Sequence, residues 1–244
     1  MKSLKEYLNS ISQQTKIDYK KASVILLLPG DNDLVWDLLW IFEDILFPDF
    51  LWKKVMFDFP ELDDHTIEPP VFNKIRNESW LISDFNNRLN ISLWLYLNSK
   101  IIYSNSFFFK DELDKAFQNF QKNLRHTIEL KYLELRSERH NLRQAIQKNN
   151  KGGVLIIKAT ILKLFYEICF LVDGSPYPYK KLLHTNIMNC KNGLKSLEIG
   201  KLWIESDSRN IISLSDELIF FLSEILKHIG FSPDFLKKWW LYLK

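Results

Sequence analysis

The stretch that decides the fold is VLIIKATILKLFYEICFLVDGSPYPYKKLLH, residues 154–184. Its first part, residues 154–172, is apolar on nearly every side, which is typical of a helix buried at the centre of a bundle. Asp173 and Gly174 end that helix, because glycine readily adopts the left-handed conformation common at helix ends. The stretch therefore predicts a buried central helix followed by a bend.

The bend GSPYPYKKLLH is stiff, aromatic and basic. Its two prolines fix their own φ angles and push the preceding residues toward extended geometry. One interpretation is a rigid corner between two helices, with the tyrosines wedged against the bundle. The other is a cleft, facing the N-terminal region, in which tyrosines and lysines meet a nucleotide or a phosphate. The candidate binding residues of the bend are Tyr177, Tyr179, Lys180 and Lys181.

A long helix is predicted before this stretch, over residues 110–150, because its apolar residues recur with the helical period of about 3.6 residues. Within it, residues 122–151 contain eight Lys or Arg and three acids, a net charge of +5, so the rest of the chain sums to −2 against an overall +3. Such a local excess is typical of a surface that meets nucleic acid, and also of a solvated helix face. The candidate contacts are Arg136, Arg139 and Arg143.

The N-terminal part has a mixed pattern. Residues 89–96 alternate between apolar and polar, which predicts a strand that pairs with residues 100–104 in a hairpin. The segments before it are predicted as a helix, a short buried strand, a second helix and an irregular segment with three prolines: residues 1–21, 24–28, 33–47 and 59–80. The fold class is therefore α+β, with a small mixed sheet domain in residues 1–108 and a predominantly helical bundle in residues 109–244.

Two helices close the predicted bundle, with Ser213 and Ser232 as their capping residues and Pro233 at the first position of the last one. In this last helix, Trp239 and Trp240 are adjacent and cannot both point into one core. The last helix is therefore a candidate for binding a protein partner or for self-association.

Composition limits the class of protein. The longest uncharged stretch, Leu89–Ser99, is far shorter than the ~20 apolar residues that span a bilayer. The first residues lack the apolar run of a secretory signal. Two cysteines are too few for a disulfide framework, and no Cys/His pair has the spacing of a metal site. We expect a cytoplasmic protein with no membrane span and no structural metal.

The order of these segments resembles that of a known group of proteins. It runs from a hairpin ending KIIYSN through a long charged helix, NNKGG and an apolar helix to YPYKKLLH, over about residues 80–190. This order is similar to that of nucleotidyltransferase-type proteins of the polymerase-β superfamily that carry a HEPN-like helical domain. The resemblance implies a nucleotidyltransferase-like region in residues 1–108 and a HEPN-like bundle in residues 109–244.

The sequence departs from this group at the residues that catalysis needs. Such transferases use a Gly-Ser turn and three carboxylates to hold two metal ions about 3.5–4 Å apart. Here Asp31 and Asp33 are the candidate carboxylates, in a pattern that is also ordinary turn chemistry. The position of the third carboxylate falls on Asn90 and Ser92, and Ser104 stands where the group often has Asp. The resemblance therefore implies a degenerate transferase region.

HEPN-type ribonucleases pair an arginine with a nearby histidine, and RSERH supplies Arg136 and His140, one residue closer together than usual. Three functions remain open. The first is a non-catalytic protein that binds nucleic acid or a nucleotide, or is a subunit of an oligomer or complex. The second is an active transferase that uses Asp31 and Asp33 with Mg²⁺ and an NTP. The third is a ribonuclease or toxin in which the histidine is the acid or base.

Overall fold

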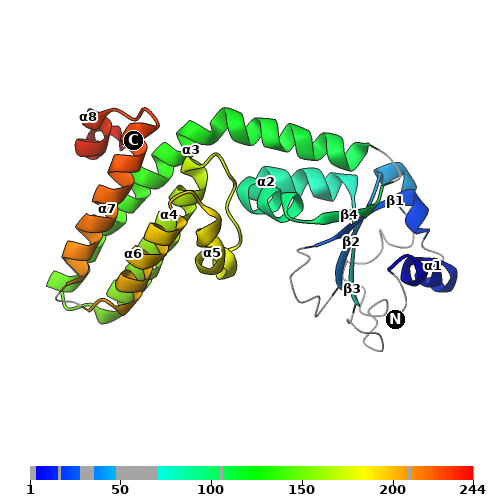
Figure 1. The fold of residues 1–244 in the computed structure, drawn as a ribbon, viewed down its shortest axis with the longest axis horizontal. Helices are drawn as coiled ribbons and strands as arrows, with labels where there is room; N and C mark the ends of the chain where they lie inside the picture. Colours follow the sequence, from blue (N-terminus) through cyan, green and yellow to red (C-terminus); the bar gives the residue numbers. More distant parts are fainter. Residues whose placement is uncertain are drawn as a thin grey trace. The chain divides into compact units, whose positions relative to one another are not determined.

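The computed structural model describes residues 4–15, 18–27, 36–47, 71–104, 107–207 and 210–243. The fold is α+β, as predicted, with a sheet near the N-terminus followed by helices (Figure 1). Contacts within the chain divide it into two units, Met1–Phe120 and Gln121–Lys244. The division falls inside helix α3, Phe108–Gln147, whose first residue is the last residue of the predicted N-terminal domain.

The sheet of the first unit has four strands in the order β3-β2-β1-β4. Strand β1 is antiparallel to both of its neighbours, and β2 is parallel to β3. Strand β1 confirms the short buried strand predicted at residues 24–28. The strands are β1 Ala22–Leu26, β2 Trp36–Phe42, β3 Val71–Asn77 and β4 Lys100–Tyr103.

The helix predicted over residues 33–47 is wrong, because its described part holds strand β2 and the short 3-10 helix η2, Asp44–Leu46. Residues 38–42 of β2 are all buried. A strand covered on both faces shows no alternation, so its sequence cannot be told from a buried helix by periodicity. Strand β3 lies in the segment predicted to be irregular, and there every second residue is buried.

The predicted hairpin is also wrong, because residues 89–96 belong to helix α2, Glu78–Leu97. Asn77 caps this helix by accepting a hydrogen bond from the Trp80 amide at 3.1 Å. The helix has a kink at Arg88, which pairs with the buried Asp84. Residues 92–96 are buried on every side of the helix, so their apparent alternation carried no information about a sheet face.

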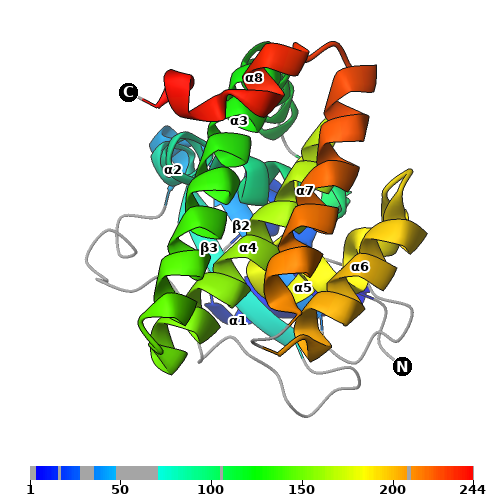
Figure 2. The same cartoon turned by 90° about the vertical axis from the view of Figure 1, so that its left-hand side faces the viewer.

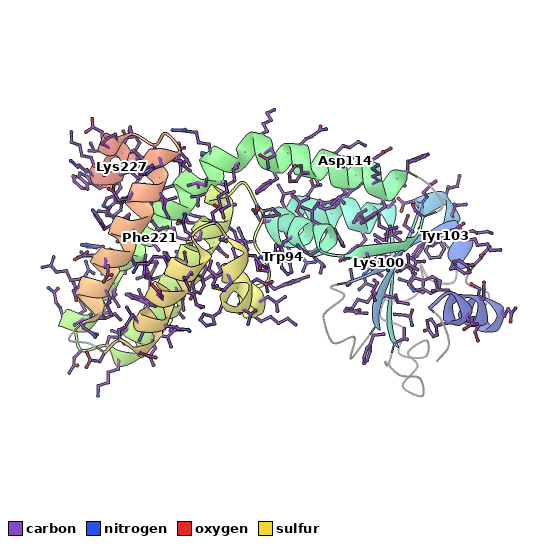
Figure 3. The ribbon with its side chains drawn as sticks, viewed as in Figure 1. Trp94, Lys100, Tyr103, Asp114, Phe221 and Lys227 are labelled. Carbon is purple, nitrogen blue, oxygen red and sulfur yellow. The ribbon has the colours of Figure 1, made fainter. Side chains whose placement is uncertain are left out.

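The core of the first unit lies between one face of the sheet and helix α1, Leu4–Thr15. A polar chain crosses it: Trp40 Nε1 donates to Asn73 Oδ1 at 2.9 Å, and Asn73 Nδ2 donates to Tyr7 Oη at 2.7 Å. At the edge strand, Tyr103, which is labelled in Figure 3, packs edge-on against Tyr19. The predicted N-terminal helix is confirmed, and it covers this face of the sheet.

The second unit is a helical bundle in which α4, α6 and α7 run side by side (Figure 2). Its centre is the second half of α4, where Phe165 is fully buried against Phe221 of α7, the residue labelled in Figure 3. The first half of this helix, which was also predicted to be buried, has no buried residue before Ile161. The helices after α3 are α4 Lys151–Val172, α5 Lys180–Asn186, α6 Gly193–Glu205, α7 Ile211–His228 and α8 Pro233–Lys237.

The last helix is shorter than predicted, because α8 ends at Lys237 and the 3-10 helix η5, Trp239–Tyr242, follows. Its predicted cap is confirmed, since Ser232 Oγ accepts from the Phe235 amide at 3.1 Å. Helix α7 begins two residues before its predicted cap, Ser213. No helix in the described ranges is long and apolar enough to cross a membrane.

Candidate anion-binding site

The second half of the stretch 154–184 forms one wall of a pocket between α4 and α5, with a volume of about 460 Å³. Three of its lining residues are lysines, Lys163 on α4 and Lys180 and Lys181 on α5. Tyr166 and His184 complete the polar part, and alanine and leucine side chains supply most of the apolar part. The structure thus brings two predicted binding residues together with three that the sequence argument did not select.

The bend places α5 back against α4. Helix α4 ends at Val172, and Gly174 follows with a φ of 74° and donates its amide to the Leu171 carbonyl at 2.9 Å. The two prolines that follow are buried, so the chain turns tightly over the end of the helix. Tyr179, with a φ of −53° and a ψ of 147°, immediately precedes α5. The prediction of a stiff corner between two helices is therefore confirmed.

A buried ionic cluster holds Tyr177 of the bend. Glu167 of α4 accepts a hydrogen bond from Lys131 Nζ at 2.6 Å and forms an ion pair with Lys163 Nζ at 3.3 Å. The Lys131 ammonium also lies 4.8 Å from the centre of the Tyr177 ring. Burial lowers the pKa of Lys131, but Tyr177 and Glu167 outweigh it and raise this pKa overall. Tyr177 therefore belongs to an internal cluster that fixes the bend on α3.

The pocket carries uncompensated positive charge. No Asp or Glu lines it, and Lys180 and Lys181 are exposed and have no carboxylate partner in the part of the chain that the structure describes. Lys163 shares a single carboxylate, Glu167, with Lys131. An ammonium group is a compact charge that binds phosphate oxygens without demanding one direction of approach. The arrangement is therefore suited to an anion.

Tyr166 and His184 are joined across the two helices, with Tyr166 Oη 3.0 Å from His184 Nδ1. Burial raises the pKa of the Tyr166 hydroxyl to about 12, so it keeps its proton at neutral pH. The sequence contained one signal for His184 and none for Tyr166. His184 follows Lys180 by four residues, a spacing that puts both on one face of a helix.

The arginines predicted on α3 have a different environment. Arg136 Nη1 donates to the Leu236 carbonyl at 3.0 Å and to Tyr132 Oη at 2.9 Å, and its guanidinium lies 5.4 Å from the centre of the Trp239 ring. Arg139 forms an ion pair with Asp216 of α7. Arg143 is exposed, with no ion pair to any described residue. Their role in nucleic-acid binding stays a prediction.

The candidate catalytic residues are not gathered into a site within the described ranges. Asp31 and Asp33 lie outside them. His140 is exposed and its Nε2 is 2.9 Å from Gln144 Nε2, whereas Arg136 of the same helix is turned toward the C-terminal segment. Across those ranges, no three His, Cys, Asp or Glu side chains are placed to hold a metal ion.

Asn90 and Ser92, at the expected position of the third carboxylate, lie on α2 and not on a strand. Ser92 Oγ donates to the buried Asp84 at 2.6 Å. Asp84 also pairs with Arg88, so this carboxylate is engaged within its own helix.

Comparison with known proteins relates the fold to a solved structure. No family model matches the chain, and no curated protein matches it. The structure of a nucleotidyltransferase-like protein from Exiguobacterium sibiricum 255-15 matches it with a TM-score of 0.51 and 13% sequence identity, covering 93% of this chain and 75% of the other. The fold is nucleotidyltransferase-like. At this identity the nucleotidyltransferase-like fold does not carry an activity with it, because function depends on the residues of a site.

Proposed function

We propose that this chain is a non-catalytic phosphate-binding protein with a nucleotidyltransferase-like region and a HEPN-like bundle. Its ligand is a nucleotide or the phosphates of a nucleic acid, bound in the pocket between α4 and α5. The observation that carries the proposal is the convergence of Lys163, Lys180 and Lys181 on a pocket that no carboxylate lines.

The size and lining of the pocket support this ligand class. Pockets for small molecules enclose about 300–1,000 Å³ and are mostly apolar with a few polar groups. The pocket of about 460 Å³ lies within that range, with leucine side chains beside the three lysines. A nucleotide combines the same two characters, because its base is flat and weakly polar while its phosphates are anionic.

The state of the sheet supports a non-catalytic role. Ser104, where the resembling group often has Asp, has its Oγ 3.2 Å from Ser23 Oγ at the end of the sheet. The strand carboxylate Asp37 forms an ion pair with Lys74 of the neighbouring strand at 2.9 Å. The alternative, an active transferase with Mg²⁺ and NTP as cofactors, depends on Asp31 and Asp33.

A matched pair of double variants tests the binding proposal. Lys180→Gln/Lys181→Gln removes two charges from the pocket, and Lys191→Gln/Lys201→Gln removes two exposed charges elsewhere on the same bundle. Hydrogen bonds to charged groups contribute roughly 1.5–3 kcal/mol, and about 1.4 kcal/mol is tenfold in affinity. We expect the pocket variant to bind ATP or a short single-stranded RNA at least about tenfold more weakly, and the control to match the wild type.

Two outcomes oppose the proposal. Equal losses in both double variants would show that only net charge matters, and no binding of either probe to the wild type would remove the pocket as a phosphate site. Loss with ATP alone points to a free nucleotide, whereas loss with RNA alone points to a nucleic acid.

The catalytic alternatives have separate tests. We expect no transfer of label from a radioactive NTP in the presence of Mg²⁺, and no cleavage of RNA. Transfer that Asp31→Ala/Asp33→Ala abolishes would establish the transferase, and cleavage that His140→Ala abolishes would establish the ribonuclease or toxin.

A further inference from the structure

The pocket between α4 and α5 holds one ring whose two nitrogens have different surroundings. Nδ1 of His184 lies 3.0 Å from Tyr166 Oη, and no described residue hydrogen-bonds to Nε2. His184 is half-buried and lines the pocket with the three lysines. We propose that Tyr166 fixes His184 so that its Nε2–H is a directed donor to a phosphate oxygen of the ligand. This inference rests on the proposed function.

The tyrosine hydroxyl suits either charge state of the ring. Because the pKa of Tyr166 is raised by burial to about 12, the hydroxyl carries its proton at neutral pH. It donates to Nδ1 when the imidazole is neutral and accepts from Nδ1–H when the ring is protonated. In both states Nε2 bears the remaining N–H, so the pocket keeps one donor at this position.

Gly200 of α6 makes room for this hydroxyl. A Cβ atom added at Gly200 would lie 1.8 Å from Tyr166 Oη and 2.7 Å from Cζ, closer than any such contact permits. The space around Gly200 is thus filled by the tyrosine. Three helices meet at this point, with Tyr166 on α4, His184 on α5 and Gly200 on α6. Gly200 and Tyr166 are positioning residues, because they act on the ligand only through His184.

The directed donor adds a property that the lysines lack. Flexible ammonium groups attract an anion without fixing its orientation, whereas an imidazole N–H held by a second hydrogen bond points along one line. The geometry therefore assigns the lysines to attraction and His184 to the orientation of the phosphate.

Two substitutions of His184 separate this role from a structural one. The amide nitrogen of glutamine reaches about as far as Nε2, and that of asparagine about as far as Nδ1. With ATP as the probe in titration calorimetry, we expect His184→Gln to stay within about threefold of the wild type. We expect His184→Asn, which keeps only the group beside Tyr166, to bind about tenfold more weakly. If the contact with Tyr166 were merely structural, asparagine would be the better replacement.

The positioning residues are tested in the same assay. Tyr166→Phe and Gly200→Ala should each weaken ATP binding by about three- to tenfold, and neither should weaken it further in the His184→Asn background. In the free protein, long-range ¹H–¹⁵N spectra should show the Nδ1 resonance of His184 shifted by Tyr166→Phe. Circular dichroism checks that the Gly200 variant folds, and Tyr166→Phe carries the test if it does not.

The outcomes distinguish this inference from the proposed function. If the Lys180/Lys181 double variant binds as the wild type does, or the wild type binds neither ATP nor RNA, the proposed function fails and this inference with it. If the lysines matter while His184→Gln and His184→Asn bind alike, only the directed donor is wrong. The same calorimetry with a short RNA decides the case of a protein that binds RNA and not ATP.

Discussion

Two basic regions of the second unit differ in what surrounds their charges. On α3, Arg136 and Arg139 contact the C-terminal segment and α7, so their charged groups hold the bundle together. Beside α4, Lys180 and Lys181 have no carboxylate partner among the described residues. The α3 region has the larger excess of positive charge in the sequence, but two of its three candidate arginines are engaged by other residues, whereas neither candidate lysine of the pocket has a carboxylate partner among the described residues. The density of basic residues therefore does not distinguish engaged charges from available ones, whereas their pairing does.

The chemistry of the two side chains explains this division. A guanidinium presents several donors in a plane and stacks on rings, which suits an anchor such as Arg136 between the Leu236 carbonyl and Trp239. An ammonium is strongly hydrated and mobile, so it remains available to an incoming anion. Substitutions that exchange these roles, or remove them, test the comparison.

The largest loss of stability is expected on substitution of Glu167, because this residue joins the two regions by pairing with both Lys131 and Lys163. Breaking a buried ion pair by removing one partner costs about 3–5 kcal/mol, since the other charge stays buried. Glu167→Gln should lower the free energy of unfolding in urea by about that much. Lys131→Met/Glu167→Leu should recover most of it, and a loss below about 1 kcal/mol in the single variant would contradict the role of the cluster.

The next effect is expected at Arg136. Arg136→Gln removes the charged donor from the Leu236 carbonyl and Tyr132 Oη, which we expect to cost about 1.5–3 kcal/mol. Arg143→Gln, at an exposed position, should change the free energy of unfolding by less than about 0.5 kcal/mol. Urea denaturation measures both.

The same two variants test the predicted nucleic-acid face of α3. If it contacts RNA phosphates, each substitution lowers affinity and reduces the slope of log affinity against log salt by roughly one. We expect unchanged RNA affinity for both, and a reduced slope would break the comparison between the two regions.

The sequence predicted the bundle better than the sheet. The helix predicted at residues 154–172 is confirmed and ends at Asp173 and Gly174, but it is buried only from Ile161 onward, because Leu155 and Ile156 are exposed. Strand β2 was not, because as a central strand it is buried on both faces and lacks a period of two. Residues 89–96 show the opposite error, because they were predicted as a strand and form a helix. A helix that is buried on all sides can contain an alternating run of apolar and polar residues by chance. Burial on every side removes the pattern that distinguishes the two structures.

Two of the five polar residues that form the core of the candidate site, Lys180 and Lys181, could be predicted. Lys180 and Lys181 follow a motif that indicates a bend, so their selection needed no knowledge of packing. Lys163 could not be selected, because a lysine on an apolar helix gives no sign of the pocket it lines. The contact between Tyr166 and Gly200 depends on how α4 meets α6, and no spacing within the sequence encodes it.

A smaller effect is expected at the two adjacent tryptophans, which continue the comparison at the C-terminus. Trp239 is half-buried beside Arg136, whereas the side chain of Trp240 is 55% exposed. Trp239→Ser should destabilise the protein by about 1 kcal/mol through the lost cation–π contact, and Trp240→Ser by less than about 0.5 kcal/mol. If the protein self-associates through this segment, as predicted, the Trp240 variant should have a lower mass in solution than the wild type. Light scattering measures this mass.

The effect that is smallest at neutral pH is expected at Tyr166, and it appears only in alkaline solution. Burial raises the pKa of Tyr166 from 10.0 to about 12 in the folded chain. Between these values the unfolded chain loses the phenol proton first, so the contribution of Tyr166 is fully present below about pH 10 and is lost as the pH rises toward 12. Tyr166 is 1% exposed in the folded chain, so burial disfavours its phenolate there, and below about pH 9 the phenol is protonated in both states and adds no pH dependence. Because other groups of the bundle titrate in the same range, the quantity to measure is the difference in unfolding free energy between the wild type and Tyr166→Phe from pH 9 to 12. The wild type should lose stability more steeply than the variant, and parallel curves would show that the hydroxyl is no less solvated in the folded chain than in the unfolded one.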